Sequence, residues 1–144
     1  MKFKVDVDLS EIKELSQKYP AISRKVRYAK VKEALEYAKT RMIAYTPKSK
    51  STRSSASVKY GPLSEGFKTA EYTPRTAVYG LIANNLFYGK ILEYGRKAGI
   101  SKRSWRVYGD IPATKWFSKG MSRAQGGIET ILGEIPDAII NEVG

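Results

Sequence analysis

The side chains that could do chemistry in the middle of this chain are carboxylates. Only four acids occur between residues 37 and 125: Glu65, Glu71, Glu93 and Asp110. A hydrolase with two catalytic carboxylates, or a nuclease with two metal ions, needs acids that converge on one point, whereas these four stand in unrelated sequence contexts. The chain also has no cysteine and no histidine, which excludes thiol nucleophiles, imidazole bases and Cys/His zinc sites. We therefore predict no catalytic residue, no metal and no cofactor.

Lysine and arginine are in excess, and they gather in two clusters. The 144 residues carry 26 bases and 14 acids, a formal net charge of +12, which suits contact with polyanions or acidic protein surfaces. The first cluster lies over residues 48–59, a segment rich in serine and poor in apolar residues that we expect to be a flexible loop. Its bases, predicted to face DNA or a protein partner, include Lys48, Lys50, Arg53 and Lys59.

The second cluster is a predicted loop over residues 96–109, in which aromatic and basic side chains alternate. Aromatic residues among bases can stack on single-stranded nucleic acid, but a tryptophan beside an arginine is also typical of the centre of a protein interface. We favour the protein interface and keep nucleic acid as the alternative. The residues concerned are Arg96, Lys97, Lys102, Arg103 and Arg106, with Trp105 and Tyr108 among them.

Glu93 stands out because it is a lone acid within the apolar segment 86–94. One interpretation is a carboxylate in water at the end of a strand. The other is a partly buried acid, which would need a basic partner because an unpaired buried carboxylate is costly. The candidate partners are Lys90, Arg96 or a base of a neighbouring subunit.

Charge is also distributed unevenly along the chain. The residues after Gln125 contain four acids and no base, whereas the first 125 residues contain 26 bases and ten acids, a net charge of +16. A basic body and an acidic tail are self-complementary. Unlike surfaces of this kind support head-to-tail association of identical subunits into a ring.

Hydrophobic periodicity predicts two helices in residues 8–45. The first begins at Asp8 or Ser10 and runs to Tyr19, and Pro20 opens the second, which ends before Pro47. Before them, residues 1–7 alternate apolar and charged residues, as a short strand or an arm would. The second helix has one continuous apolar stripe, made of Tyr28, Val31, Leu35, Ala38, Met42 and Tyr45.

The rest of the chain predicts a small sheet followed by C-terminal helices. In the sheet region, residues 61–95, strands are expected at 67–71 and 77–84, and residues 86–94 form a short helix or strand. In residues 112–144, Pro112 is expected to open a helix that Gly126 and Gly127 break, and Pro136 to open the last one. The fold class is α+β: one domain, residues 1–144, with a long N-terminal amphipathic helix packed across a small antiparallel sheet.

Four segments together resemble a known family. They are the helix ending in Thr46-Pro47, the segment 61–67 (GPLSEGF), the segment 88–95 (YGKILEYG) and the Pro112 segment with its Trp-Phe pair. This series resembles the tail-completion and neck (head–tail joining) proteins of long-tailed bacteriophages, the gene-product-ten-like tail components and the lambda minor tail protein Z group. The resemblance covers roughly residues 10–125, and its structural motif positions are Thr46, Pro47, Gly61, Leu63 and Pro112.

This sequence departs from the family pattern at three places. Gly89 stands where the family usually has alanine, Tyr60 stands where threonine is expected, and the basic loop 48–59 is inserted before it. The absent threonine removes any role that the family gives to that side chain. The inserted loop is a feature particular to this protein.

The resemblance implies a non-enzymatic virion protein of the neck or tail. Such proteins form rings, here a hexamer or dodecamer, between the head connector and the tail-tube or tail-terminator proteins, and genomic DNA passes through the lumen. Assembly would take place in the cytoplasm of the bacterial host. No secretory signal or membrane span is expected, because charged residues follow Met1 at once and apolar runs are short. The predicted subunit or connector contacts are Tyr88, Glu93, Tyr94, Gly95, Arg96, Lys97, Trp105 and Arg106.

Two other functions compete with this one. A small basic nucleic-acid-binding protein would grip phosphates through the two lysine- and arginine-rich loops, and its affinity would fall steeply with salt. A small basic RNA-cleaving toxin is disfavoured because histidine is absent and acids are scarce.

Overall fold

The computed structural model describes residues 10–47, 63–72, 78–100, 102, 105 and 107–144. Several residues named in the predictions lie outside these ranges. They include the apolar alternation in residues 1–7 and the first basic loop with Lys48, Lys50, Arg53 and Lys59, together with Gly61, Arg103 and Arg106.

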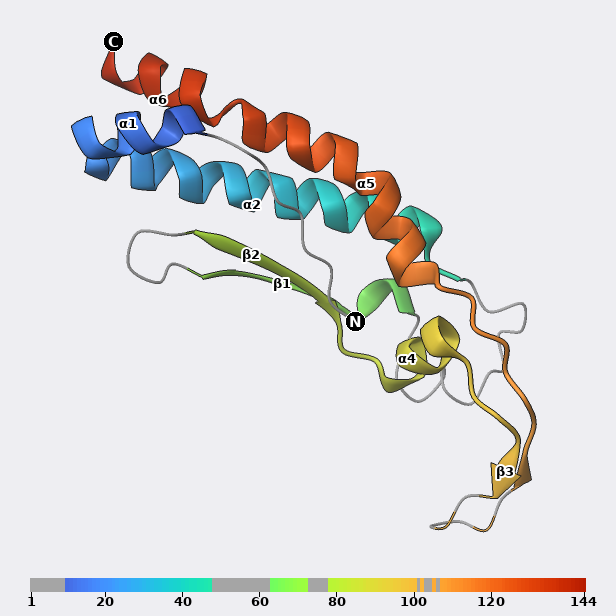
Figure 1. The fold of residues 1–144 in the computed structure, drawn as a ribbon. Coiled ribbons are helices and arrows are strands. Elements are labelled where there is room, and N and C mark those ends of the chain that lie inside the picture. Colours follow the sequence, from blue (N-terminus) through green and yellow to red (C-terminus); the bar gives the residue numbers. More distant parts are fainter. Residues whose placement is uncertain (1–9, 48–62, 73–77, 101, 103–104, 106) are drawn as a thin grey trace.

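Helices form one layer of the molecule and a two-stranded sheet lies against it (Figure 1). α1 (Ser10–Lys18) and α2 (Pro20–Tyr45) come first, and α5 (Trp116–Gly133) and α6 (Ile135–Val143) come last. α5 lies antiparallel along α2, while α1 and α6 lie together at the start of α2. The predicted α+β class, with the long helix 20–45 packed on an antiparallel sheet, is confirmed.

The sheet is a hairpin of β1 (Phe67–Tyr72) and β2 (Tyr79–Asn84), preceded by the 3-10 turn η1 (Leu63–Glu65). The antiparallel register pairs Phe67 with Asn84 at one end and Tyr72 with Tyr79 at the other. β1 alternates between its inner face, which includes Phe67, and an exposed outer face, as expected for a half-buried strand. Segment 86–94, left open as helix or strand, is the helix α4 (Phe87–Tyr94).

The core lies between α2, α5 and the inner face of the sheet. Phe67 packs its ring edge-on to Trp116, with ring centroids 6.0 Å apart, and stacks on Phe117 at 6.4 Å. These aromatic contacts anchor the start of α5 to the sheet. The buried apolar residues of this core are Ala34, Leu35, Ala38, Met42, Leu63, Phe67, Ile82, Trp116, Phe117, Met121, Ala124 and Ile128.

The apolar stripe of α2 is confirmed at its centre and wrong at its ends. Leu35, Ala38 and Met42 are buried, but Tyr28 and Tyr45 are exposed. The Tyr45 ring is instead covered by the guanidinium of Arg123, whose Cζ lies 4.6 Å from the ring centroid. The predicted end of the helix is confirmed, because the hydroxyl of Thr46 donates to the Met42 carbonyl oxygen at 2.8 Å.

The predicted break at Gly126 and Gly127 is wrong, since α5 continues through both to Gly133. The physical reason at Gly127 is close packing: a Cβ there would lie 2.1 Å from Cζ of Tyr37 on α2. Glycine costs about 1 kcal/mol in a helix, but tertiary packing overrides such a propensity. Gly127 therefore marks a close approach of α5 to α2, not a turn, whereas a Cβ on Gly126 would meet nothing within 4 Å.

Candidate functional site

The buried acid Glu93 connects α4 to the start of α5. Its carboxylate accepts hydrogen bonds from the backbone N–H of Phe117 at 2.7 Å and of Ser118 at 3.3 Å, and from the Ser118 hydroxyl. Those two N–H groups belong to the first turn of α5, where no earlier residue of the helix can accept them. Glu93 therefore acts as the N-cap acceptor of α5, and its negative charge also favours this end of the helix.

This arrangement corrects the expectations for Glu93. The side chain is only 1% exposed, so it is neither a carboxylate in water nor available to a neighbouring subunit in this fold. Its partners are not Lys90 or Arg96, but the backbone and a hydroxyl group of α5. Sequence reasoning identified a buried acid that needs a partner, but it looked for a base and missed Ser118.

The carbonyl end of α4 is closed by the segment that precedes α5. Thr114 donates both its backbone N–H and its hydroxyl to the Leu92 carbonyl oxygen, at 2.7 and 2.6 Å, and the Lys115 N–H donates to the Glu93 carbonyl oxygen at 3.2 Å. The two helices thus cap each other. We call this reciprocal arrangement, formed by Leu92, Glu93, Thr114, Lys115 and the N–H groups of Phe117 and Ser118, the clamp.

The clamp explains why the prediction for Pro112 is wrong. α5 begins at Trp116, four residues later, and Lys115 before it adopts a left-handed conformation with φ of 54°. The left-handed backbone of Lys115 interrupts any helix that would run on from Pro112, and the N–H groups of Thr114 and Lys115 bond to α4 instead. Pro112 is exposed and leads an extended connection.

Gly95 ends α4 with a turn of the backbone. Its φ is +77°, and a Cβ there would lie 2.8 Å from both the Ile111 carbonyl oxygen and the Ala113 nitrogen. Both atoms belong to the backbone, which cannot swing away as a flexible side chain can. Only glycine satisfies this conformation and this contact without strain.

Gly89 and Leu63 hold the other end of α4 against the core. The indole Nε1–H of Trp116 donates to the Gly89 carbonyl oxygen at 3.0 Å, and a Cβ on Gly89 would lie 3.1 Å from Leu63 Cδ2. Asn84 is buried and donates its amide to the Leu63 carbonyl oxygen at 2.7 Å. The described part of the first motif segment, residues 63–67, and segment 88–95 therefore meet inside the molecule.

The two tyrosines of α4 differ in exposure. Tyr88 is half-buried against the core, and burial, with a smaller contribution from the charge of Glu65, raises the pKa of its phenol. Tyr94 is exposed, and the Lys115 ammonium lies 4.8 Å from its ring centroid. Of these two predicted contact residues, Tyr94 is the one that offers most of its ring to a partner.

Beyond the clamp, the described residues of the segment 96–111, which are 96–100, 102, 105 and 107–111, project from the body as an arm (Figure 1). At its root, Arg96 and Ile111 exchange two backbone hydrogen bonds of 2.8 and 2.7 Å. Further out, β3 (Gly99–Ile100) pairs antiparallel with β4 (Val107–Tyr108). Between these two pairings, the Asp110 carboxylate accepts a hydrogen bond from the Ala98 N–H, which connects the two sides of the arm.

The arm displays large apolar side chains to solvent. Trp105 and Val107 are each 80% exposed and Ile100 is 58% exposed. The exposed bases Lys97 and Lys102 lie on the same arm. This combination of apolar and basic side chains outside the core is typical of a surface that another molecule covers.

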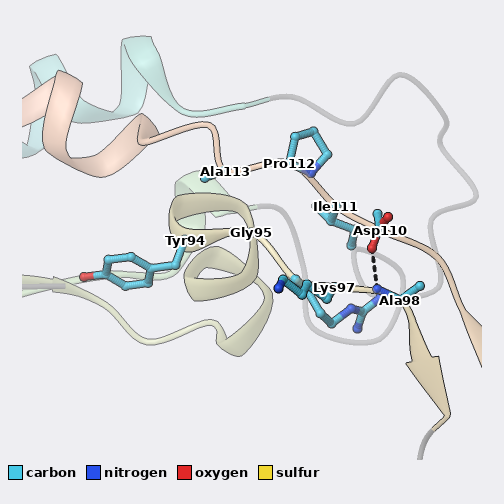
Figure 2. Close-up of a pocket in the computed structure, with 9 residues that line it drawn as sticks. Tyr94, Gly95, Lys97, Ala98, Asp110, Ile111, Pro112 and Ala113 are labelled. Atoms are coloured by element: carbon cyan, nitrogen blue, oxygen red, sulfur yellow. Dashed lines mark hydrogen bonds between the residues drawn. The ribbon is translucent and has the colours of Figure 1, made fainter.

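A shallow cavity lies at the root of the arm, where the arm leaves the clamp (Figure 2). It brings together four of the predicted contact residues, Tyr94, Gly95, Arg96 and Lys97, and Asp110 is the one carboxylate among its described lining residues. The lining consists of Tyr94, Gly95, Arg96, Lys97, Ala98, Asp110, Ile111, Pro112 and Ala113.

Within the described ranges, no three His, Cys, Asp or Glu side chains lie together in a way that could hold a metal ion. The one buried carboxylate of the clamp is fully engaged with α5. The site thus consists of a rigid internal clamp, a cavity with two bases and an exposed arm.

Comparisons with known protein families, curated proteins and solved structures give no match for this chain. No helix in the described part of the chain is both long enough and apolar enough to cross a membrane.

Proposed function

We propose that this chain is a structural virion protein of a long-tailed phage, which completes the neck or tail end and joins the tail to the head connector as a subunit of an oligomeric ring. The proposal rests on the resemblance of segments 46–47, 61–67 and 88–95 to tail-completion and neck proteins, and on the arm. We also propose that the protein has no enzymatic activity.

The observation that carries the proposal is the exposure of the arm. A two-stranded hairpin is marginally stable at best in water, and this one leaves Ile100, Trp105 and Val107 uncovered by its own chain. Such side chains gain free energy when a protein partner buries them, at roughly 25 cal/mol per Å² of apolar surface. The clamp holds the root of the arm in a defined direction, so less conformational entropy is lost on docking.

The proposed partners are other copies of the chain, the head connector, and the tail-tube or tail-terminator proteins. A hexameric or dodecameric ring would place part of the basic surface toward the lumen, where genomic DNA passes. Lys97 and Lys102 are the described bases on the arm that suit either DNA or an acidic protein surface.

Electron microscopy of particles from an infection that lacks this protein tests the proposal. We expect full heads beside unattached tails of normal appearance, and joined particles when the protein is supplied in trans. Normally joined virions in the absence of the protein would refute the joining role.

The second candidate function is binding of nucleic acid. It is favoured by one observation, the exposed Trp105 ring on an arm that also carries Lys97 and Lys102, because base stacking and phosphate neutralisation act together. Titration of a fluorescent single-stranded oligonucleotide at 50 and 200 mM salt tests it. Three to five phosphate contacts would reduce the affinity by roughly 20- to 100-fold over this range, whereas the joining role requires no such binding.

A further inference from the structure

We propose that the arm of one copy docks on the outer surface of α6 of a second copy, so that the chains associate head to tail. The inference rests on the ring of the proposed function and names the two surfaces that meet in it. Four observations carry it: the composition of α6, the composition of the arm, their places in the fold and the ion pairs around α6.

The outer surface of α6 combines apolar and acidic side chains. Ile140 is 55% exposed and Val143 is also exposed, although both are large apolar residues. The charged residues of α6 are Asp137 and Glu142, and residues 135–143 contain no base. This helix therefore offers carboxylates beside an apolar patch.

The arm carries the opposite charge beside an apolar patch of its own. Residues 96–110 contain five bases and one acid, and that acid, Asp110, already accepts a backbone hydrogen bond within the arm. Ile100 and Val107 can bury Ile140 while Lys97 and Lys102 face the carboxylates. Opposite charges that flank matched apolar patches steer association and fix its orientation.

The two surfaces lie at opposite ends of the molecule (Figure 1). The clamp and the Arg96–Ile111 bridge hold the root of the arm at the end where α5 begins, whereas α6 lies beside α1 at the other end. One chain cannot bring its own arm to its own α6 without losing the clamp. A contact between two different surfaces must therefore join different copies, and repeated copies close into a ring or continue as a filament.

The ion pairs already present in the chain distinguish the acids within α6 from Glu134, which precedes this helix. Glu134, just before α6, accepts a hydrogen bond of 2.7 Å from Lys30, and this hydrogen bond is the main cause that raises the pKa of the lysine. Glu142 lies 3.6 Å from Lys25, but the two side chains are 51% and 74% exposed. An ion pair this exposed contributes little and can exchange for a new partner.

The outer face of the sheet is a second exposed apolar surface in the described part of the chain. It displays Tyr72, Tyr79 and Leu81, but Lys68 is the charged residue on that face. This lysine repels the bases of the arm, whereas the carboxylates of α6 attract them. Charge therefore favours α6 over the sheet.

Disulfide trapping tests the contact, because the natural chain contains no cysteine. We would mix a size-tagged Val107→Cys variant with Ile140→Cys at low salt, add a mild oxidant and resolve the products on a non-reducing gel. We expect mixed dimers at least tenfold above those formed by Val107→Cys with Leu81→Cys, a control on the sheet. Equal or greater cross-linking to Leu81→Cys, Val107→Cys pairing only with itself, or no mixed dimer would overturn the proposal.

Charge reversal then tests the pairing of the two surfaces. Adding Lys97→Glu and Lys102→Glu to the Val107→Cys copy should reduce mixed dimers about tenfold. Adding Asp137→Lys and Glu142→Lys to the Ile140→Cys partner should restore them. Restoration supports the contact, and failure to restore them in two folded variants contradicts it.

The outcome is separable from that of the proposed function. If cross-linking fails while an infection without the protein still yields unattached heads and tails, the joining role stands and only the contact between arm and α6 is wrong. If heads and tails join without the protein, the proposed function fails whatever the cross-links show.

Discussion

The clamp and the arm are neighbours in sequence but opposite in character. Glu93 in the clamp is 1% exposed and bonded to two backbone N–H groups, whereas Trp105 and Val107 in the arm are 80% exposed. The clamp thus stabilises the fold, whereas the arm that follows it in the chain presents an exposed surface. The difference implies that substitutions in the clamp reduce stability, while substitutions in the arm reduce assembly and leave stability unchanged.

Gly95→Ala should have the largest effect on stability. The new Cβ would be forced into a positive-φ conformation and against two backbone atoms at 2.8 Å, so we expect a loss of about 4 kcal/mol in the free energy of unfolding, measured by urea denaturation. Gly109→Ala in the arm is the matched control, because nothing lies within 4 Å of its added Cβ. Equal losses for the two variants would show that the close backbone packing at Gly95, next to the clamp, does not add to stability.

Glu93→Ala should come next, at about 3 kcal/mol. The substitution leaves the N–H groups of Phe117 and Ser118 without their acceptor and opens a void in a buried site. Chemical denaturation measures the loss, with Glu129→Ala as a control, since that glutamate is exposed on α5, the helix that Glu93 caps. If the control variant lost as much stability as Glu93→Ala, the loss could not be assigned to the hydrogen bonds that Glu93 makes to α5.

Trp116→Phe should destabilise the protein by about 2 kcal/mol. Phenylalanine keeps an aromatic ring in the core but loses the indole N–H that donates to the Gly89 carbonyl oxygen, and it fills less space. Thermal unfolding followed by circular dichroism would report the change. No change in the melting temperature would mean that this hydrogen bond does not hold α4 to α5.

Trp105→Ala should have the smallest effect on stability, within about 0.5 kcal/mol, because the side chain is almost fully exposed. Its effect should fall on association instead, as expected for an exposed aromatic residue that a partner buries. Unfolding midpoints and cross-linking yields, compared for the same preparation, separate the two. A strongly destabilised Trp105→Ala protein would erase the distinction between arm and clamp.

The sequence predicted the helices and strands where one local pattern dominates. The 20–45 helix follows from its starting proline, its apolar period and the proline after it, and β1 follows from its alternation. The misplaced elements all depend on contacts between distant segments. Pro112 does not open α5, because the backbone N–H groups of Thr114 and Lys115 bond to carbonyl oxygens of α4. Gly127 does not end α5, because the Tyr37 ring packs against it.

The candidate site was predictable in part. The sequence singled out Tyr94, Gly95, Arg96 and Lys97, and the structure gathers them around one cavity. Exposure is not encoded in residue type, so Glu93 and Trp105 were assigned to one interface although one is buried and the other exposed. Ser118 and Asn84 carried no sequence signal, because their roles depend on segments more than twenty residues away.

The most direct test of the central claim is complementation with an altered arm. Cells infected by phage lacking this protein would be supplied with a variant carrying Ile100→Ser, Trp105→Ser and Val107→Ser, and joined particles would be counted by negative-stain microscopy. We predict a folded, soluble variant that leaves full heads beside unattached tails, while the wild-type protein restores joining. Restoration of joining by this variant to the wild-type level would contradict the account, because the arm would then not be the docking surface.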